Sequence, residues 1–178
     1  SFDGNGYNIT GLTINSPTKN YVGLFGYTEG ATIENVALED VNIKGKDNTG
    51  GLVGVANSST VSNSYATGSV SGSKHTGGLV GYAYNSTRIT TSYATGEVSG
   101  KNHTGGLVGR AYQSSVTNSY ATGAVTGTGE RTGGLVGWAD DSTSISNSYA
   151  TGSVEGISEV GGLVGYANRS TKITDSYA

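Results

Sequence analysis

The strongest constraint on the fold of this chain is a sequence repeat. A Gly-Gly-Leu-Val-Gly phrase occurs five times, and a Ser-Tyr-Ala phrase follows each copy about a dozen residues later. The second glycine of the phrase stands at Gly51, Gly78, Gly106, Gly134 and Gly162, with spacings of 27 or 28 residues. A degenerate copy at Gly23-Leu24-Phe25-Gly26 adds one more period. A period kept this closely indicates a repeat architecture, in which each unit buries its apolar face against the next unit.

Each repeat has the composition of short β-strands rather than helices. β-Branched residues and tyrosine dominate, glycine interrupts the pattern, and no 3.6-residue apolar spacing lasts. One unit contains the apolar run Leu79-Val80, an alternating stretch led by Ile89 and, after Thr95-Gly96, a piece that carries Val98. We therefore predict an all-β fold, a right-handed parallel β-solenoid (β-helix) with about 28 residues and three short strands per coil, and about six coils.

Stacking of identical coils places equivalent residues in columns, because each strand pairs with the same strand one coil along. The expected columns are leucine (Leu24, Leu52, Leu79, Leu107, Leu135, Leu163), isoleucine or valine (Ile33, Val61, Ile89, Val116, Ile145, Ile173) and tyrosine (Tyr65, Tyr93, Tyr120, Tyr149, Tyr177). Each tyrosine follows the isoleucine or valine by four residues, an even offset that places both on one side of a strand. We expect the tyrosine column to begin at Leu38 and to be at least partly buried.

The paired glycines are expected at a sharp corner of the coil. Such a corner needs either a positive φ or a close approach of two backbones, and both favour glycine. A β-branched residue at Gly106 or Gly134 should therefore be costly.

The chain reads as one domain, residues 1–178. Residues 1–45 are richer in large aliphatic side chains than the rest and are expected to form an atypical first coil. Residues 46–178 hold the regular repeats, and the last coil reads as incomplete. The absence of an initiator methionine at Ser1 favours an excised or processed fragment.

Charge and composition narrow the function classes. The net charge is −3, and the 10 lysines and arginines do not cluster, so no nucleic-acid surface is expected. No apolar run reaches the ~18 residues of a membrane span, so no membrane insertion is expected. The chain has no cysteine, which excludes disulfides and thiolate metal sites. We expect no cofactor.

Candidate metal and catalytic groups are weak. His75 and His103 hold equivalent positions, but Asn48, Arg131 and Val160, which occupy the same position in other coils, supply no third ligand, so we interpret the histidines as solvated turn residues. Asp140-Asp141 is an acidic pair with too few neighbouring oxygens for calcium. The carboxylates of Glu97, Glu130, Glu155 and Glu159 are scattered rather than paired for glycoside hydrolysis. We predict no enzyme activity.

A second column is the candidate ligand or assembly surface. It follows the glycine phrase and contains Tyr27, Val55, Tyr82, Arg110, Trp138 and Tyr166, and its odd offset from leucine predicts an outward face. Exposed aromatic rings there would stack on sugars or pack against another molecule, and a plain stabilising surface ladder is the simpler alternative. A column of Thr67, Thr95, Thr122 and Thr151 raises a weaker ice-binding hypothesis.

The repeated Gly-Gly-Leu-Val-Gly and Ser-Tyr-Ala-Thr-Gly phrases resemble the GLUG-motif repeat over essentially the whole chain. Such repeats occur in large secreted or surface-anchored bacterial proteins, including adhesins and non-catalytic regions of immunoglobulin A-cleaving metallopeptidases. The resemblance implies a secreted or cell-surface module without catalytic residues. We expect an extracellular structural or adhesive rod or fibre that associates end to end with itself or with neighbouring repeat domains, or that contacts glycans or surface proteins. The alternatives are a carbohydrate-binding module and, less favoured, a glycan-active enzyme or an ice-binding protein.

Overall fold

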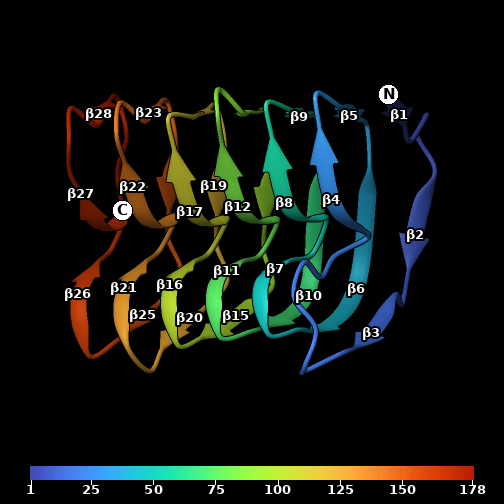
Figure 1. Ribbon diagram of the computed structural model, residues 1–178, viewed down its shortest axis with the longest axis horizontal. Coiled ribbons are helices and arrows are strands. Elements are labelled where there is room, and N and C mark those ends of the chain that lie inside the picture. Colours follow the sequence, from blue (N-terminus) through green and yellow to red (C-terminus); the bar gives the residue numbers. More distant parts are fainter.

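The computed structural model describes residues 1–178 and contains strands but no helix. The chain forms a row of stacked coils, with the N-terminal coil at one end and the C-terminal coil at the other (Figure 1). Strands pair in parallel with their counterparts one repeat away, as Ile89 does with Val61 and Val116. The predicted all-β parallel solenoid is confirmed, and one of its sheets takes one strand from each of six coils.

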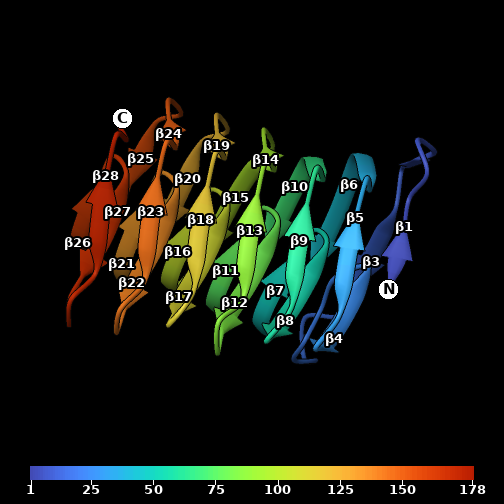
Figure 2. The ribbon, with the colours of Figure 1, turned by 90° about the horizontal axis from the view of Figure 1, so that it is seen from above.

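Four parallel sheets run along the solenoid, which Figure 2 shows from above. We name each sheet after the strand that residues 47–71 contribute to it. The β7 sheet contains β7 (Asp47–Gly50), β11 (Lys74–Gly77), β16 (Asn102–Gly105), β21 (Glu130–Gly133) and β26 (Ser158–Gly161). The β8 sheet contains β4 (Phe25–Glu29), β8 (Val53–Asn57), β12 (Val80–Tyr84), β17 (Val108–Tyr112), β22 (Val136–Asp140) and β27 (Val164–Ala167).

The other two sheets complete each coil. The β9 sheet contains β1 (Phe2–Asp3), β5 (Thr32–Glu34), β9 (Thr60–Ser62), β13 (Arg88–Thr90), β18 (Ser115–Thr117), β23 (Ser144–Ser146) and β28 (Lys172–Thr174). The β10 sheet contains β2 (Asn8–Thr10), β3 (Thr13–Asn15), β6 (Ala37–Lys44), β10 (Tyr65–Ser71), β14 (Tyr93–Ala94), β15 (Glu97–Gly100), β19 (Tyr120–Ala121), β20 (Val125–Gly127), β24 (Tyr149–Ala150) and β25 (Val154–Glu155).

The prediction of three strands per coil is therefore too low. Polar residues such as those of β11, which the sequence pattern assigns to a turn, form a strand whose backbone pairs with β7 and β16. Pairing between coils, rather than apolar alternation within one segment, holds this strand in place. A strand of this kind carries little periodic signal.

The interior of the coil is apolar, and two predicted columns are confirmed. Leu52, Leu79, Leu107 and Leu135 are completely buried. The isoleucine and valine column is in register from Ile33 to Ile173. Alanines of the β8 sheet, which pair in the same way, fill the rest of the core: Ala56, Ala83, Ala111 and Ala139. Their small size matches the narrow space inside a coil.

The tyrosine column is displaced from its predicted position. Tyr65 pairs with Ala37, whereas Leu38 pairs with Ala66, and both Leu38 and Ala66 are buried. The tyrosine rings consequently lie on the outside of the coil, partly exposed. Between Val61 and Tyr65, Asn63 adopts a left-handed conformation with φ 48°. This corner breaks the two-residue alternation on which the even-offset argument depends.

The paired glycines lie at a corner, as predicted, and close backbone contact is the reason. A Cβ atom on Gly51 would lie 2.5 Å from the carbonyl oxygen of Gly78, and one on Gly106 would overlap that of Gly134. These glycines do not have the positive φ that the sequence allowed as the other reason. The glycine column lets consecutive coils approach closely at this corner.

A buried serine ladder stabilises the corner between the β9 and β10 sheets. Ser64, Ser92, Ser119 and Ser148 are each about 1% exposed. Each hydroxyl accepts a hydrogen bond from the backbone of the previous coil, as when Ser64 N donates to Ser92 Oγ at 3.2 Å. The same hydroxyl donates to a carbonyl two residues earlier, Thr90 O for Ser92, at 2.8 Å. The ladder satisfies polar groups that the corner would otherwise bury unpaired.

Candidate functional site: a face of stacked aromatic and cationic side chains

The candidate surface lies on the outer side of the β8 sheet. Backbone pairing places its six predicted members opposite one another in consecutive coils, and we call them the central row: Tyr27, Val55, Tyr82, Arg110, Trp138 and Tyr166. The predicted register of this column is thus observed. Tyr27 is 49% exposed, and Val55 is the buried member, 3% exposed.

A second row borders the central row from the β7 sheet. Its members occupy equivalent positions, all have a left-handed backbone with φ of 54–63°, and we call them the histidine row: Tyr21, Asn48, His75, His103, Arg131 and Glu159. Thr132 pairs with Val160, so Glu159, and not Val160 as predicted, occupies this position in the last coil. A repeated left-handed residue within a strand re-aims its side chain.

A third row follows two residues after the central row, at or just beyond the ends of the same strands. We call it the outer row: Glu29, Asn57, Tyr84, Tyr112, Asp140 and Asn168. The Tyr84 ring stacks on that of Tyr82, with centroids 5.0 Å apart and 19° between the planes. The three rows together form one continuous face of the solenoid.

Guanidinium groups fill the spaces between the aromatic rings of the central row. The Arg110 guanidinium lies 3.8 Å from the ring centroid of Trp138 and 5.2 Å from that of Tyr82. Arg131 lies 4.1 Å from Trp138 and 4.7 Å from Tyr166. Cation–π contacts of this kind contribute about 0.5–2 kcal/mol each. Because cations occupy the space next to these rings, Tyr82, Trp138 and Tyr166 do not form the flat open platform that sugar stacking requires.

The two histidines are buried rather than solvated. His75 is 7% and His103 6% exposed, and their rings stack with centroids 4.9 Å apart. His75 also lies against Tyr82, and His103 against Trp138. The turn interpretation was wrong because the left-handed backbone brings both rings against the central row.

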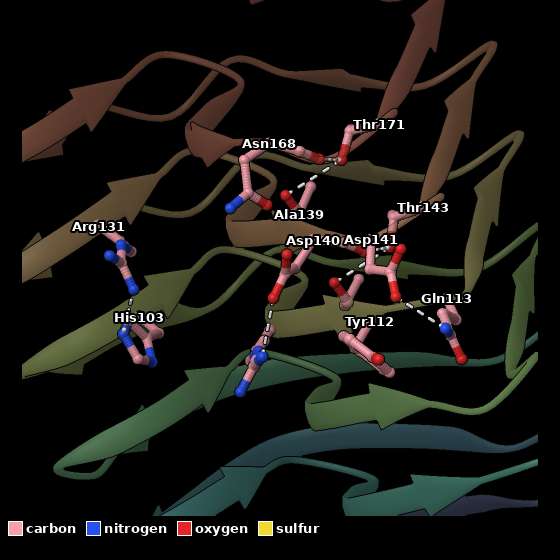
Figure 3. A network of polar contacts seen from close by, with 12 residues as sticks. His103, Tyr112, Gln113, Arg131, Ala139, Asp140, Asp141, Thr143, Asn168 and Thr171 are labelled. Atoms are coloured by element: carbon pink, nitrogen blue, oxygen red, sulfur yellow. Dashed lines mark hydrogen bonds and ion pairs between the residues drawn. The ribbon is translucent and has the colours of Figure 1, made fainter.

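Hydrogen bonding and burial keep both imidazoles neutral. His75 Nδ1 is 2.7 Å from Asn48 Oδ1, an acceptor, so Nδ1 carries the proton. Arg131 Nη1 is 3.2 Å from His103 Nε2, so this nitrogen accepts (Figure 3). Burial, followed by the charges of the neighbouring cationic groups, lowers the pKa of His75 to about 2 and that of His103 to about 3. The structure contains no group of three His, Asp or Glu side chains that could hold a metal ion.

The acidic pair Asp140-Asp141 forms two separate contacts. Asp140 accepts a hydrogen bond from Arg110 Nη2 at 2.9 Å, and its side chain is only 2% exposed. Asp141 accepts one from Gln113 Nε2 at 2.8 Å. In Figure 3 the two carboxylates point in different directions from the end of β22. Asp140 therefore acts as the partner of Arg110, and the pair does not form a shared cation cage.

The tyrosine column forms a separate ladder at the start of the β10 sheet strands. Rings of Tyr65, Tyr93, Tyr120, Tyr149 and Tyr177 stack with centroids 4.7–5.1 Å apart and planes within 5° of parallel. At one end, Tyr65 donates its phenolic proton to Glu39 at 2.9 Å. Since each inner ring covers the face of the next, this ladder presents ring edges rather than faces.

Sequence reasoning missed three features of this face. It did not connect the histidine row with the central row, it did not place Asp140 beside Arg110, and it did not identify the outer row. The repeat period could have revealed all three, because two positions that recur with the same period keep the same separation in every coil. The left-handed backbone that joins the rows has no comparable signal.

The strands account for all of the regular secondary structure, and no helix that could span a membrane is present.

The comparisons with known proteins agree with this architecture. The chain is similar to the crystal structure of an immunoglobulin A1 protease-like protein from Bacteroides ovatus, with a TM-score of 0.77 and 23% sequence identity. The similarity covers 100% of this chain and 59% of that chain, and it concerns the fold.

A search among curated proteins found no match. The GLUG motif, by contrast, matches four consecutive segments, residues 47–71, 72–99, 100–126 and 128–155. These segments are the repeats whose strands form the four sheets. They cover more than half of the chain, which therefore belongs to the GLUG motif family.

Proposed function

We propose that this chain is an extracellular structural and adhesive repeat module, a non-catalytic rod on a microbial cell surface. The observation that carries the proposal is the unbroken stacking of coils, in which core, glycine corner and serine ladder repeat in register. Such a solenoid offers long, regular side faces at fixed spacing, a property that suits contact with extended partners. Membership of the GLUG family and the likeness to a protease-like protein support an extracellular setting.

The chemistry of the described face supports contact rather than catalysis. Its carboxylates are either paired, as Asp140 is with Arg110, or dispersed among separate coils. Its histidines are buried and neutral, with Asn48 and Arg131 as neighbours. No pair of acid and base lies beside an open space, an arrangement that general acid–base catalysis requires.

Carbohydrate binding at Tyr82, Trp138 and Tyr166 has weaker support, because arginine guanidinium groups lie against these rings. The module could also act by association with a second copy or with adjoining repeat domains. Association with a second copy or with an adjoining repeat domain would be a further form of the same adhesive role.

Two measurements test the proposal. Negative-stain electron microscopy and light scattering over a concentration series should give rods, and filaments would show end-to-end association. Beads coated with the protein should be retained on immobilised extracellular proteins or mucin in a saturable way, competed by soluble protein. Compact particles, or retention no greater than that of beads coated with an unrelated β-solenoid, would reject the proposal.

A further inference from the structure

One coil interrupts the central row. Val55 stands where the neighbouring coils carry the aromatic rings of Tyr27 and Tyr82. A cavity of about 220 Å³ lies at this interruption, and four tyrosines line it: Tyr21, Tyr27, Tyr82 and Tyr84. We call this cavity the Val55 slot. Tyr27 and Tyr84, from the coils on either side of Val55, are hydrogen-bonded to each other through their hydroxyl groups at 3.0 Å.

The same face contains an occupied version of this arrangement two coils away. There Arg110 holds the position of Val55, and its guanidinium lies between Tyr82 and Trp138, the rings of the two adjacent coils. The outer row supplies the carboxylate of Asp140, 2.9 Å away. In the Val55 slot the equivalent rings are Tyr27 and Tyr82, the guanidinium is missing, and Tyr84 holds the position that Asp140 has beside Arg110. The Arg110 site shows that a guanidinium group fits between two aromatic rings that stand two coils apart in the central row.

Charge around the slot complements a cation. Glu29 does not line the slot but lies beside the hydroxyl of Tyr27, which does: Asn57 Nδ2 donates a hydrogen bond to Glu29 Oε1 and one to the Tyr27 hydroxyl, each at 3.1 Å. His75 also lines the slot, but its Nδ1 bonds to Asn48 and its Nε2 is enclosed by protein atoms, so neither ring nitrogen is open to a ligand.

Proximity to Arg110 does not exclude a second cation. Trp138 already has two guanidinium groups near its ring, Arg110 at 3.8 Å and Arg131 at 4.1 Å. A cation in the Val55 slot would share Tyr82 with Arg110 in the same manner. The stacking of alternating rings and guanidinium groups would then extend from Tyr166 to Tyr27.

We propose that the Val55 slot binds the guanidinium group of an arginine side chain on a partner polypeptide. The tyrosine rings supply cation–π contacts, and Glu29, which lies beside the Tyr27 hydroxyl, supplies the opposite charge. The inference deepens the proposed adhesive function by naming a contact group for it. It is tested on the isolated chain with a soluble ligand, so its outcome is independent of bead retention.

The experiment is a titration of the chain with N-acetyl-arginine amide, followed by calorimetry and by NMR of the tyrosine rings. Choline, N-acetyl-lysine amide and methyl glucoside serve as comparison ligands. The decisive variant is V55R, which places the chain's own guanidinium in the slot as Arg110 does. E29Q removes the opposing charge, and Y149L, on the tyrosine ladder, is the matched control.

The parent chain should saturate with a dissociation constant on the order of 1 mM, as expected for a small ligand with few contacts. V55R should abolish binding, E29Q should weaken it about threefold to tenfold, and Y149L should leave it unchanged. V55F, which fills the slot with an apolar ring, should also abolish binding and replaces V55R if that variant does not fold. Failure of the parent to saturate, unchanged binding by the filled variants, or equal binding of choline or methyl glucoside would overturn the proposal.

Discussion

The carboxylate of Asp140 is almost completely buried and receives a 2.9 Å hydrogen bond from Arg110, whose guanidinium also lies 3.8 Å from the Trp138 ring. One side chain thus neutralises a buried charge and joins two coils. The ion pair between Arg131 and Glu159 has the same length but is more exposed, at 21% and 33% for the two side chains. Burial, not distance, distinguishes the two pairs energetically.

Removal of Arg110 alone should therefore be costly. R110M leaves the Asp140 charge buried and unpaired, and we expect a loss of about 3 kcal/mol in the free energy of unfolding. The double variant R110M/D140N removes both charges and should recover at least half of that loss. E159Q, at the exposed pair, should cost less than about 1 kcal/mol. Urea denaturation of the four proteins measures these values, and equal effects of R110M and E159Q would contradict the argument.

The glycine corner gives a second comparison between equivalent positions. G106A places a methyl group against the carbonyl oxygen of Gly134, so the coils must separate, and we expect a loss of about 2–4 kcal/mol. At Gly162 the same substitution meets only the Cβ of Ala178, 3.0 Å away. G162A should cost less than about 1 kcal/mol. Thermal and urea denaturation test the difference, and similar losses for both variants would show that inter-coil contact is not the cause.

The strict period made much of the fold predictable. Parallel stacking converts a repeat directly into contacts, so the leucine column and the register from Tyr27 to Tyr166 follow from spacing alone. The glycine corner was predictable for the same reason, because a glycine needed at one coil junction is needed at all of them.

The direction of side chains was less predictable. Left-handed residues occur at three places in each regular coil, as at Asn48, Ser58 and Asn63. At the first of these places the residue type varies, from Asn48 to His75 to Arg131. Such residues break the two-residue alternation, so the tyrosines were assigned inward and the histidines to solvent. Neither error follows from a wrong repeat. The corner before the tyrosines carries Asn63, Asn118 and Asn147, a residue type enriched in the left-handed region, so a signal for it was present, whereas the mixed residue types of the histidine row carry none.

The hydrogen bond between Tyr65 and Glu39 predicts an altered phenol ionisation. The bond to the carboxylate, with smaller contributions from burial and from Tyr93, raises the pKa of Tyr65 to about 12. E39Q should therefore bring the pKa of Tyr65 toward the ordinary value of about 10. The difference between the ultraviolet titrations of parent and E39Q measures the shift, and Y65F should abolish that difference. Unchanged titration in E39Q would mean that the carboxylate does not control the phenol.

The buried histidines predict a loss of stability in mild acid. Their pKa values in the folded chain are about 2 and 3, below the ordinary value of about 6.5, so the unfolded chain binds protons first as the pH falls. The stability is complete above about pH 6.5 and declines below it, by about 2 kcal/mol per histidine at pH 5. Asn48 occupies the equivalent position with the same φ of 54°, so H75N/H103N keeps a compatible backbone and should remove this pH dependence. Unfolding free energies of parent and variant from pH 8 to pH 4.5 test the prediction, and parallel curves would show that the imidazoles become protonated in the folded chain without cost.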